Sequence, residues 1–442
     1  MVVSLQPAIA RSNAAIADIH DTYTAQGHRA VVVNSGPGAG KSRLVVHTAT
    51  TIAEGREPVV VIAQTNSQCD DLIDRMAAAA PTIPLGRLCK DGYIAPVHFA
   101  GHPNTKVSAR IDDLRECRII IGTAAKWVHI TSGQWPWAII DEAYQMRSDM
   151  LLRIAGRFER MLFVGDPGQL DPFSTVEIDR WAGLPWNPMQ SAVATLLRNN
   201  PGIPQKQLPL SWRLSPSATS LVAPAFYPFA GFDAATTPEM RKLHLPVSGI
   251  GGAVDDVLHT AATTGWALYE LPSRNTIRTD AEAVHATASI AARVLQRGAE
   301  TYCETNPGGA VVRPDRIAVG AAHRDQVAAI RNELAAMGAG AIRVDTANRL
   351  QGAEYDVTVV LHPLSGRRDA TAFHLETGRL CVLASRHRHA CIVVARAGIP
   401  ELLDAHPSVE PMYLDDLVKF PDGWEANQAV LAHLAGHSVR ST

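Results

Sequence analysis

A β-branched apolar run followed at once by a glycine-rich loop and an apolar helical pattern constrains the fold of this chain more than any other feature. Residues 30–34 (AVVVN) form the run, the helical pattern begins at 43 (RLVVHTATTIA), and the loop between them is Ser35-Gly36-Pro37-Gly38-Ala39-Gly40-Lys41-Ser42. Glycines let backbone N–H groups approach phosphate oxygens, and a helix amino terminus attracts negative charge. The order strand, loop, helix therefore predicts a phosphate-binding site in an α/β domain.

Polar residues at the ends of further predicted strands add chemistry to this loop. Lys41 is expected to reach the terminal phosphates of a nucleotide, and Ser42 to offer its hydroxyl to Mg²⁺. Asp141 and Glu142 follow the apolar run 137–140, at the strand end where parallel sheets bind ligands. We expect Asp141 to hold Mg²⁺ and Glu142 to orient and deprotonate an attacking water. Gln169, after the next strand, is a candidate sensor of the γ-phosphate or the water.

Two series of buried strands predict two α/β domains with parallel sheets in tandem. The Pro- and Asn-rich passage 184–209 separates them, so the first domain is expected over 1–205 and the second over 206–442. Loop-rich insertions are expected at 78–117 and 223–265. The expected strands are 30–34, 58–63, 118–122, 137–140 and 160–164, then 316–320, 341–345, 356–361 and 390–395, with a helix over 324–337.

Charge and composition exclude several classes of protein. The 442 residues carry 41 Lys and Arg against 43 Asp and Glu, so coating of duplex nucleic acid by bulk charge is excluded, whereas a local channel for a single strand is not. No apolar run reaches 18 residues and the amino terminus lacks a signal-peptide pattern, which predicts a cytoplasmic protein with no membrane association. The six cysteines form no CxxC pair, so neither zinc nor an iron–sulfur cluster is expected.

Eight short motifs occur in a fixed order along the chain. They are Gly36–Ser42 (I), 63–66 with Asp70 and Leu72 (Ia), 122–123 (Ic), 141–145 (II), 165–170 (III), 211–214 (IV), 346–354 (V) and 379–386 (VI). In this order they resemble a superfamily 1 helicase, of the branch that contains the nonsense-mediated-decay RNA helicase and its DNA-acting relatives. The resemblance implies two tandem RecA-like P-loop domains with ATP and Mg²⁺ bound between them.

The resemblance also implies roles for individual residues. Arg386 matches the arginine finger, Arg213 a second cation on the γ-phosphate, and Glu354 a contact to the ribose. Trp212 stands where the family usually has Tyr, and either ring can stack on adenine, although a core Trp is the alternative. Four residues match family contacts to the backbone of a single strand, although such side chains are also common helix caps: Thr65, Asn66, Thr123 and Thr346.

The function implied by the resemblance is that of an ATP-dependent helicase or translocase. Its track would be single-stranded nucleic acid, with DNA slightly favoured over RNA, and movement would run 5′ to 3′. Because the same chain supplies the arginine finger, we expect a monomeric motor rather than a ring. Because the chain resembles little more than a motor core, a protein loading partner is possible. Motif VI continues as Arg386-His387-Arg388, an Arg-His form similar to that of some viral RNA helicases, which leaves the choice of DNA or RNA open. The alternative is an ATP-driven nucleic-acid-binding switch or loader that does not unwind.

Overall fold

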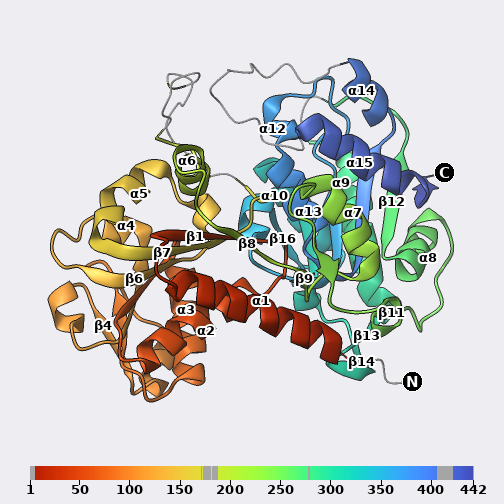
Figure 1. The fold of residues 1–442 in the computed structure, drawn as a ribbon. Helices are drawn as coiled ribbons and strands as arrows, with labels where there is room; N and C mark the ends of the chain where they lie inside the picture. The colour runs from red at the N-terminus through yellow and green to blue at the C-terminus, as the bar shows by residue number, and fades with distance from the viewer. Residues whose placement is uncertain are drawn as a thin grey trace.

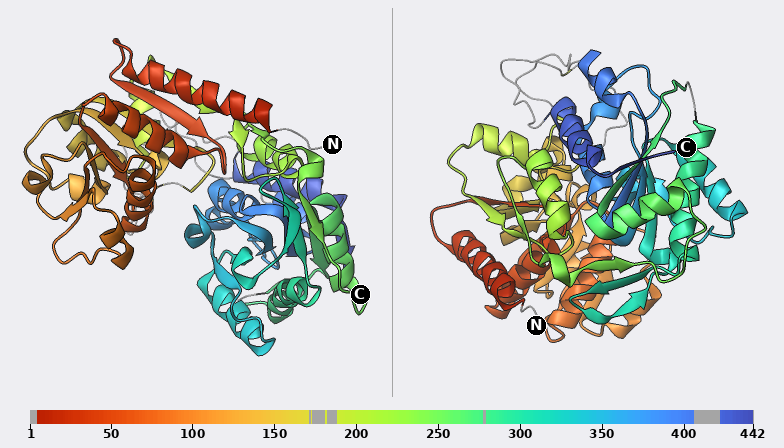
Figure 2. Two further views of the ribbon diagram at one scale, coloured as in Figure 1. Left: turned by 90° about the horizontal axis from the view of Figure 1, so that it is seen from below. Right: turned by 90° about the vertical axis from the view of Figure 1, so that its right-hand side faces the viewer.

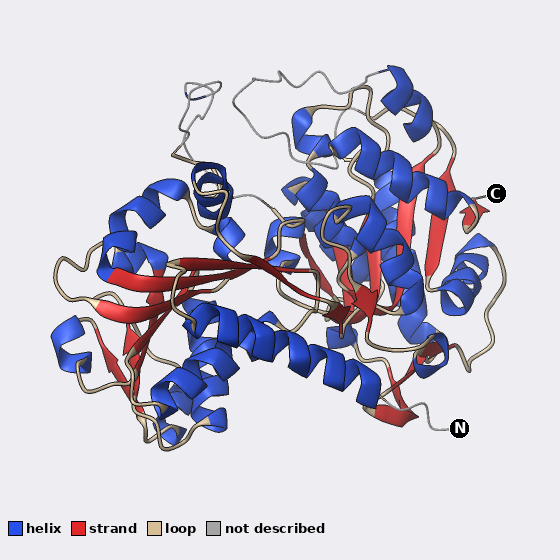
Figure 3. Ribbon diagram, viewed as in Figure 1, coloured by secondary structure: helices blue, strands red, loops and turns tan. Residues whose placement is uncertain are grey.

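The computed structural model describes residues 5–170, 172, 181, 188–276, 279–405 and 422–441. Within them the chain forms two α/β domains that lie side by side, each a twisted sheet between layers of helices (Figure 1). Figure 3 shows that helices cover both faces of each sheet, which is how parallel sheets bury their two apolar faces. The expected class, two tandem α/β domains with parallel sheets, is confirmed.

The first domain contains eight parallel strands in the order β4-β3-β5-β2-β6-β7-β1-β8. Alternate residues of each strand face opposite layers: Val31 packs with α1, α2 and α3, and Val32 with α4, α5 and α6. The strands are β1 (Ala30–Ser35), β2 (Val59–Ala63), β3 (Leu85–Leu88), β4 (Thr105–Ser108), β5 (Ile119–Thr123), β6 (Trp135–Ile140), β7 (Phe158–Gly165) and β8 (Gln205–Leu208). The helices are α1 (Gln6–Thr24), α2 (Lys41–Glu54), α3 (Asn66–Ala79), α4 (Ala124–Trp127), α5 (Ser148–Ile154) and α6 (Ala192–Asn199).

The second domain contains six parallel strands in the order β16-β15-β17-β18-β12-β19. They are β12 (Trp266–Leu271), β15 (Ile317–Ala321), β16 (Arg343–Thr346), β17 (Tyr355–Leu361), β18 (His387–Arg396) and β19 (Ser438–Arg440). One face carries α7 (Pro216–Phe226), α13 (Thr377–Ala384), α14 (Ile399–Ala405) and α15 (Gly423–Ala435). The other carries α8 (Ala253–Thr264), α9 (Ala281–Gln296) and α10 (Arg324–Ala336). Two short helices, α11 (Ala347–Leu350) and α12 (Ala372–Leu375), follow strand ends.

Two small sheets accompany the second domain. The first pairs β9 (Leu210–Ser211) with β10 (Asp233–Ala234). The second is antiparallel and contains β11 (Lys242–His244), β13 (Glu300–Cys303) and β14 (Asn306–Val311).

The nine expected strands are all present, within a few residues of their expected bounds. The expected loop-rich insertion 78–117 contributes β3 and β4, which extend the first sheet at its edge. The expected boundary at 205 coincides with the start of β8, and since β8 pairs with β1 we place the division after Leu208. Two strands that complete the second sheet, β12 and β19, are not among the expected ones.

The two domains contact each other through α1 and through the glycine-rich loop. Helix α1 runs along the first sheet and extends toward the second domain (Figures 1 and 2), where Arg11 forms a 2.7 Å ion pair with Asp233. The Ser211 hydroxyl donates a 2.6 Å hydrogen bond to the carbonyl oxygen of Pro37 in the loop. No helix among the described residues is both long and apolar enough to cross a membrane.

Candidate active site

The glycine-rich loop leaves β1 and enters α2 through two glycines in the left-handed region. Gly38 has φ +69° and Gly40 has φ +89°, conformations that L side chains rarely adopt. A Cβ on Gly38 would lie 2.3 Å from the Cβ of Arg213, and one on Gly36 would lie 2.5 Å from the Phe232 ring. Glycine is thus required both by the backbone and by the close approach of the second domain.

Ser35 occupies the position where such loops usually begin with glycine. Its hydroxyl is buried and donates a 2.8 Å hydrogen bond to the carbonyl oxygen of Gly165 at the end of β7. The serine at this position therefore connects the start of the loop to the neighbouring strand β7 by a hydrogen bond that glycine could not form.

Lys41 lies among three carboxylates at the ends of β6 and β7. Its Nζ is 3.3 Å from Glu142 Oε1 and 3.9 Å from Asp166 Oδ2. Burial alone would lower the pKa of Lys41, but the charges of Glu142, Asp166 and Asp141 outweigh it and hold that pKa above its ordinary value. The ammonium is therefore charged and fixed at the mouth of the phosphate loop.

Asp141 and Glu142 are held in different conformations at the end of β6. Glu142 has φ +49°, a value that is rare for residues other than glycine. Its backbone N–H donates a hydrogen bond to Asp141 Oδ1 at 3.0 Å. Burial, reinforced by the neighbouring Glu142 charge, raises the pKa of Asp141 to about 7. Ser42 and Asp141 line the same cavity. A hydroxyl and a buried carboxylate are oxygen donors that suit Mg²⁺, so these residues fit the expected cation.

Two arginines face this arrangement from the second domain. Burial, reinforced by the charge of Arg386, lowers the pKa of Arg213 to about 10. The Arg386 guanidinium is buried, its Nη2 donates to the Ser385 hydroxyl at 2.8 Å, and its Nη1 has no hydrogen-bond partner. Two buried cations, one with an unpartnered donor, fit a multiply charged anion such as a terminal phosphate.

These groups line one cavity of about 730 Å³ that both domains enclose. Gln169 connects them, because its Oε1 accepts a 2.9 Å hydrogen bond from Gln351 Nε2 across the cleft. Glu354 also lines the cavity and lies 3.3 Å from Arg213 Nε. The first domain contributes Gly38, Ala39, Gly40, Lys41, Ser42, Arg43, Ser67, Gln68, Asp71, Arg75, Asp141, Glu142 and Gln169, and the second contributes Arg213, Gln351, Gly352, Glu354 and Arg386.

Three expected nucleotide-binding residues are not among those that line the cavity. Gly36 and Pro37 lie at the start of the loop, where they contact the second domain. Trp212 is half-buried against the loop, and its backbone N–H donates a 2.9 Å hydrogen bond to the carbonyl oxygen of Gly38. Its ring lies 3.9 Å from where a Cβ of Gly40 would be.

The four residues expected to contact a single strand lie at the carboxyl ends of strands. The Thr65 and Thr123 hydroxyls accept hydrogen bonds from the backbone N–H groups of Gln68 and Lys126, which is helix capping. Asn66 is exposed and its Oδ1 accepts from Arg87 Nη2 at 3.0 Å. Thr346 ends β16, directly before α11, and its side chain caps no helix.

Sequence reasoning did not identify several residues that shape the site. Tyr227, after α7, donates a 2.6 Å hydrogen bond to Asp166 Oδ1 across the domains, and no motif marks it. Gln351 lies within motif V, so its position could have indicated it. Ser67, Gln68, Asp71 and Arg75 reach the cavity from α3, which periodicity alone does not reveal.

Comparison with known families matches two consecutive parts of the chain. A model described as an AAA domain matches residues 20–175, and a second model with the same description matches residues 191–398. Together they include the phosphate loop, the carboxylates after β6 and both arginines. No curated protein matches the chain.

Solved structures similar to this chain include viral and other helicases. A PRRSV helicase shares 14% identity over 87% of this chain and 54% of its own, with a TM-score of 0.41. The arterivirus nonstructural protein 10 helicase with DNA shares 11% over 88% and 65% (TM-score 0.44). The DUF1998 helicase MrfA bound to DNA and AMPPNP shares 13% over 90% and 52% (TM-score 0.45). This chain thus spans about half to two thirds of the length of these structures.

Proposed function

We propose that this chain is a superfamily 1 helicase, an NTP-hydrolysing enzyme, and that it works as an ATP-driven motor that moves 5′ to 3′ on single-stranded nucleic acid, with DNA slightly favoured over RNA. The observation that carries the proposal is the cavity between the domains, because carboxylates from one domain face two buried arginines from the other.

The chemistry of this cavity supports hydrolysis of the γ-phosphate. Glu142 orients a water molecule and takes its proton as the oxygen attacks phosphorus. Lys41, Arg213 and Arg386 stabilise the negative charge that spreads over the transferring group. Gln169, hydrogen-bonded to Gln351 of the second domain, reports whether the cleft is closed.

Ser42 and Asp141 are the residues that would hold Mg²⁺. When bound, the ion supplies positive charge to the phosphate oxygens. The positive charge of the ion would also offset the buried negative charge of Asp141.

Hydrolysis is coupled to movement through the opening of the cleft. Since the second domain supplies cations for the γ-phosphate, ATP favours the closed cleft and loss of phosphate weakens it. A strand that contacts Thr65, Asn66 and Thr123 on the first domain and Thr346 on the second is then drawn along as the domains separate and close. Short hydroxyl and amide side chains suit backbone contacts without sequence preference. The branch resemblance of the motifs supports the 5′-to-3′ direction.

ATPase rates with and without nucleic acid test this proposal. The rate is measured alone, with single-stranded DNA and with single-stranded RNA of matched sequence, and Glu142→Gln serves as the blank. We expect stimulation by DNA, with a smaller effect of RNA, and loss of both in the variant. Glu142-dependent turnover that ignores both strands would favour a partner-controlled switch instead.

A further inference from the structure

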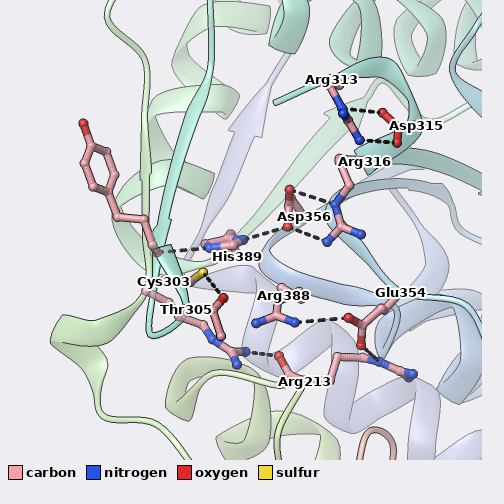
Figure 4. A network of polar contacts seen from close by, with 12 residues as sticks. Arg213, Cys303, Thr305, Arg313, Asp315, Arg316, Glu354, Asp356, Arg388 and His389 are labelled. Carbon is pink, nitrogen blue, oxygen red and sulfur yellow. Dashed lines mark hydrogen bonds and ion pairs between the residues drawn. The ribbon is translucent and has the colours of Figure 1, made fainter. Parts of the chain in front are cut away.

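A chain of ion pairs extends from Arg213 away from the cavity. Arg213 Nε lies 3.3 Å from Glu354 Oε2, and Glu354 Oε1 accepts a 3.1 Å hydrogen bond from Arg388 Nη1. Arg388 uses its other nitrogen, Nη2, to donate to Glu304 Oε1 at 2.8 Å. Figure 4 shows Arg388 directed toward Glu354 and Glu354 toward Arg213. One arginine on β18 thereby bridges two carboxylates.

Arg241 closes this chain into a ring. Its guanidinium binds Glu304 through two contacts, Nε to Oε2 at 3.1 Å and Nη2 to Oε1 at 2.8 Å. The same guanidinium donates to the main-chain carbonyl oxygens of Trp212 and Arg213. Arg213 is thus held twice, by its side chain through Glu354 and by its backbone through Arg241, and both routes meet at Glu304.

Glu304 lies outside the cavity but is buried. It occupies the turn between β13 and β14, and its side chain is 8% exposed, against 1% for Arg241. Burial alone would raise the pKa of Glu304, but Arg241 and then Arg388 outweigh it and keep the carboxyl ionised. Burying a carboxylate is costly unless it is fully paired, so this arrangement requires both arginines.

The charges of the ring explain why Arg213 needs such support. Arg213 and Arg386 line the same cavity, and the charge of Arg386 adds to burial in lowering the pKa of Arg213, because two buried cations repel each other. Glu354 and Glu304 offset part of the charge of Arg213, Arg241 and Arg388, so a net positive charge remains for the phosphate. The ring keeps Arg213 in place before the nucleotide arrives.

We propose that Glu304 is a positioning residue for ATP hydrolysis, which acts through Arg388, Glu354 and Arg241 to hold Arg213 against the γ-phosphate. The three-stranded sheet of β11, β13 and β14 then serves as a support for the catalytic cleft. This inference rests on the hydrolytic part of the proposed function and does not require movement along a strand.

Steady-state ATP hydrolysis without nucleic acid tests the inference in the full chain. Glu304→Gln is compared with Glu300→Gln, a carboxylate on the same hairpin whose contacts are Tyr302 and His244. We expect kcat to fall about 10-fold in Glu304→Gln with little change in KM, because misplacement of a catalytic cation affects the transition state most. Glu300→Gln is expected to match the wild type, and unchanged kcat in Glu304→Gln would overturn the proposal.

A double-variant cycle separates positioning from a general loss of stability. If Glu304 acts through Arg213, Glu304→Gln has no further effect on kcat in the Arg213→Ala variant. An equal loss of kcat in the wild type and in the Arg213→Ala variant would refute the proposal. Arg388→Lys should give the same pattern, since one ammonium group cannot bridge the two carboxylates as the guanidinium does. This variant replaces Glu304→Gln in the cycle if Glu304→Gln is too unstable to assay. These assays contain no nucleic acid. If nucleic acid failed to stimulate ATP hydrolysis, that result would therefore contradict the motor proposal and leave the role of Glu304 unaffected.

Discussion

At the scale of single residues, Ser35 shows how a departure from a motif can be a structural contact. Its buried hydroxyl donates to the Gly165 carbonyl oxygen, so the loop is tied to β7. Ser35→Ala should lower the free energy of unfolding by about 1–2 kcal/mol, because the buried carbonyl loses its donor. Urea denaturation measures this, with Ser220→Ala, an exposed helical serine, as the control. Equal effects of the two substitutions would contradict the account.

Arg386 is the residue whose removal should most affect chemistry while sparing binding. Arg386→Ala is expected to reduce turnover by about 10³-fold, as loss of an arginine finger does elsewhere, with ATP affinity retained. Turnover assays and binding of a fluorescent ATP analogue measure the two quantities separately. Arg313→Ala, which removes an exposed arginine paired with Asp315, is the control and should leave turnover unchanged. Normal turnover in Arg386→Ala would refute its assignment.

At the scale of elements, the end of α7 is joined to the end of β7. Tyr227 donates to Asp166, and a Cβ on Gly168 would lie 2.5 Å from the Tyr227 ring, so the two domains meet closely here. Tyr227→Phe should lower the free energy of unfolding by about 2 kcal/mol, since a buried hydrogen bond to an acidic group is lost. Thermal denaturation compares it with Tyr302→Phe, whose hydroxyl contacts Glu300 away from this interface. A larger loss of unfolding free energy in Tyr302→Phe than in Tyr227→Phe would contradict a strong contact between Tyr227 and Asp166.

The elements themselves were predictable to different degrees. Strands such as β1 and β5 are continuous apolar runs, which mark strands buried on both faces. By contrast β8 (QKQL) and β19 (SVR) are short and polar, and they become strands because a neighbouring edge is available. Likewise the two strands in 78–117 could not be foreseen, because they add to a sheet whose order is set by distant segments.

The same division holds for the candidate site. Lys41, Asp141 and Arg386 could be located from motifs, because each lies at a fixed offset from a strand or helix. Tyr227 and Glu304 could not, since their partners are distant in sequence and only the folded chain brings them together. Roles that depend on tertiary contacts therefore became visible only in the structure.

At the scale of the whole molecule, buried histidines should make stability depend on pH. Burial lowers the pKa of His362 to about 4 and, reinforced by His389, that of His387 to about 3, so both are neutral in the folded state. The unfolded chain binds these protons near pH 6.5, hence stability is lost as pH falls below that value. Between pH 7 and pH 5 each residue should cost about 2 kcal/mol.

Urea denaturation at the two pH values tests this expectation. His387→Gln should lose about 2 kcal/mol less than the wild type between pH 7 and pH 5, because its side chain no longer titrates. The comparison with the variant is needed because Asp141, whose pKa is raised, changes stability in the opposite direction. Equal pH dependence in both proteins would contradict the prediction.

The most direct measurement of the central claim is ATP-dependent displacement of streptavidin from single-stranded DNA biotinylated at one end. A motor that moves 5′ to 3′ should release streptavidin from the 3′ end, fail to release it from the 5′ end, and do neither when Glu142 is Gln. If strand-stimulated ATP hydrolysis proceeds while streptavidin stays bound at both ends, the chain is a switch, and the account of it as a motor is wrong.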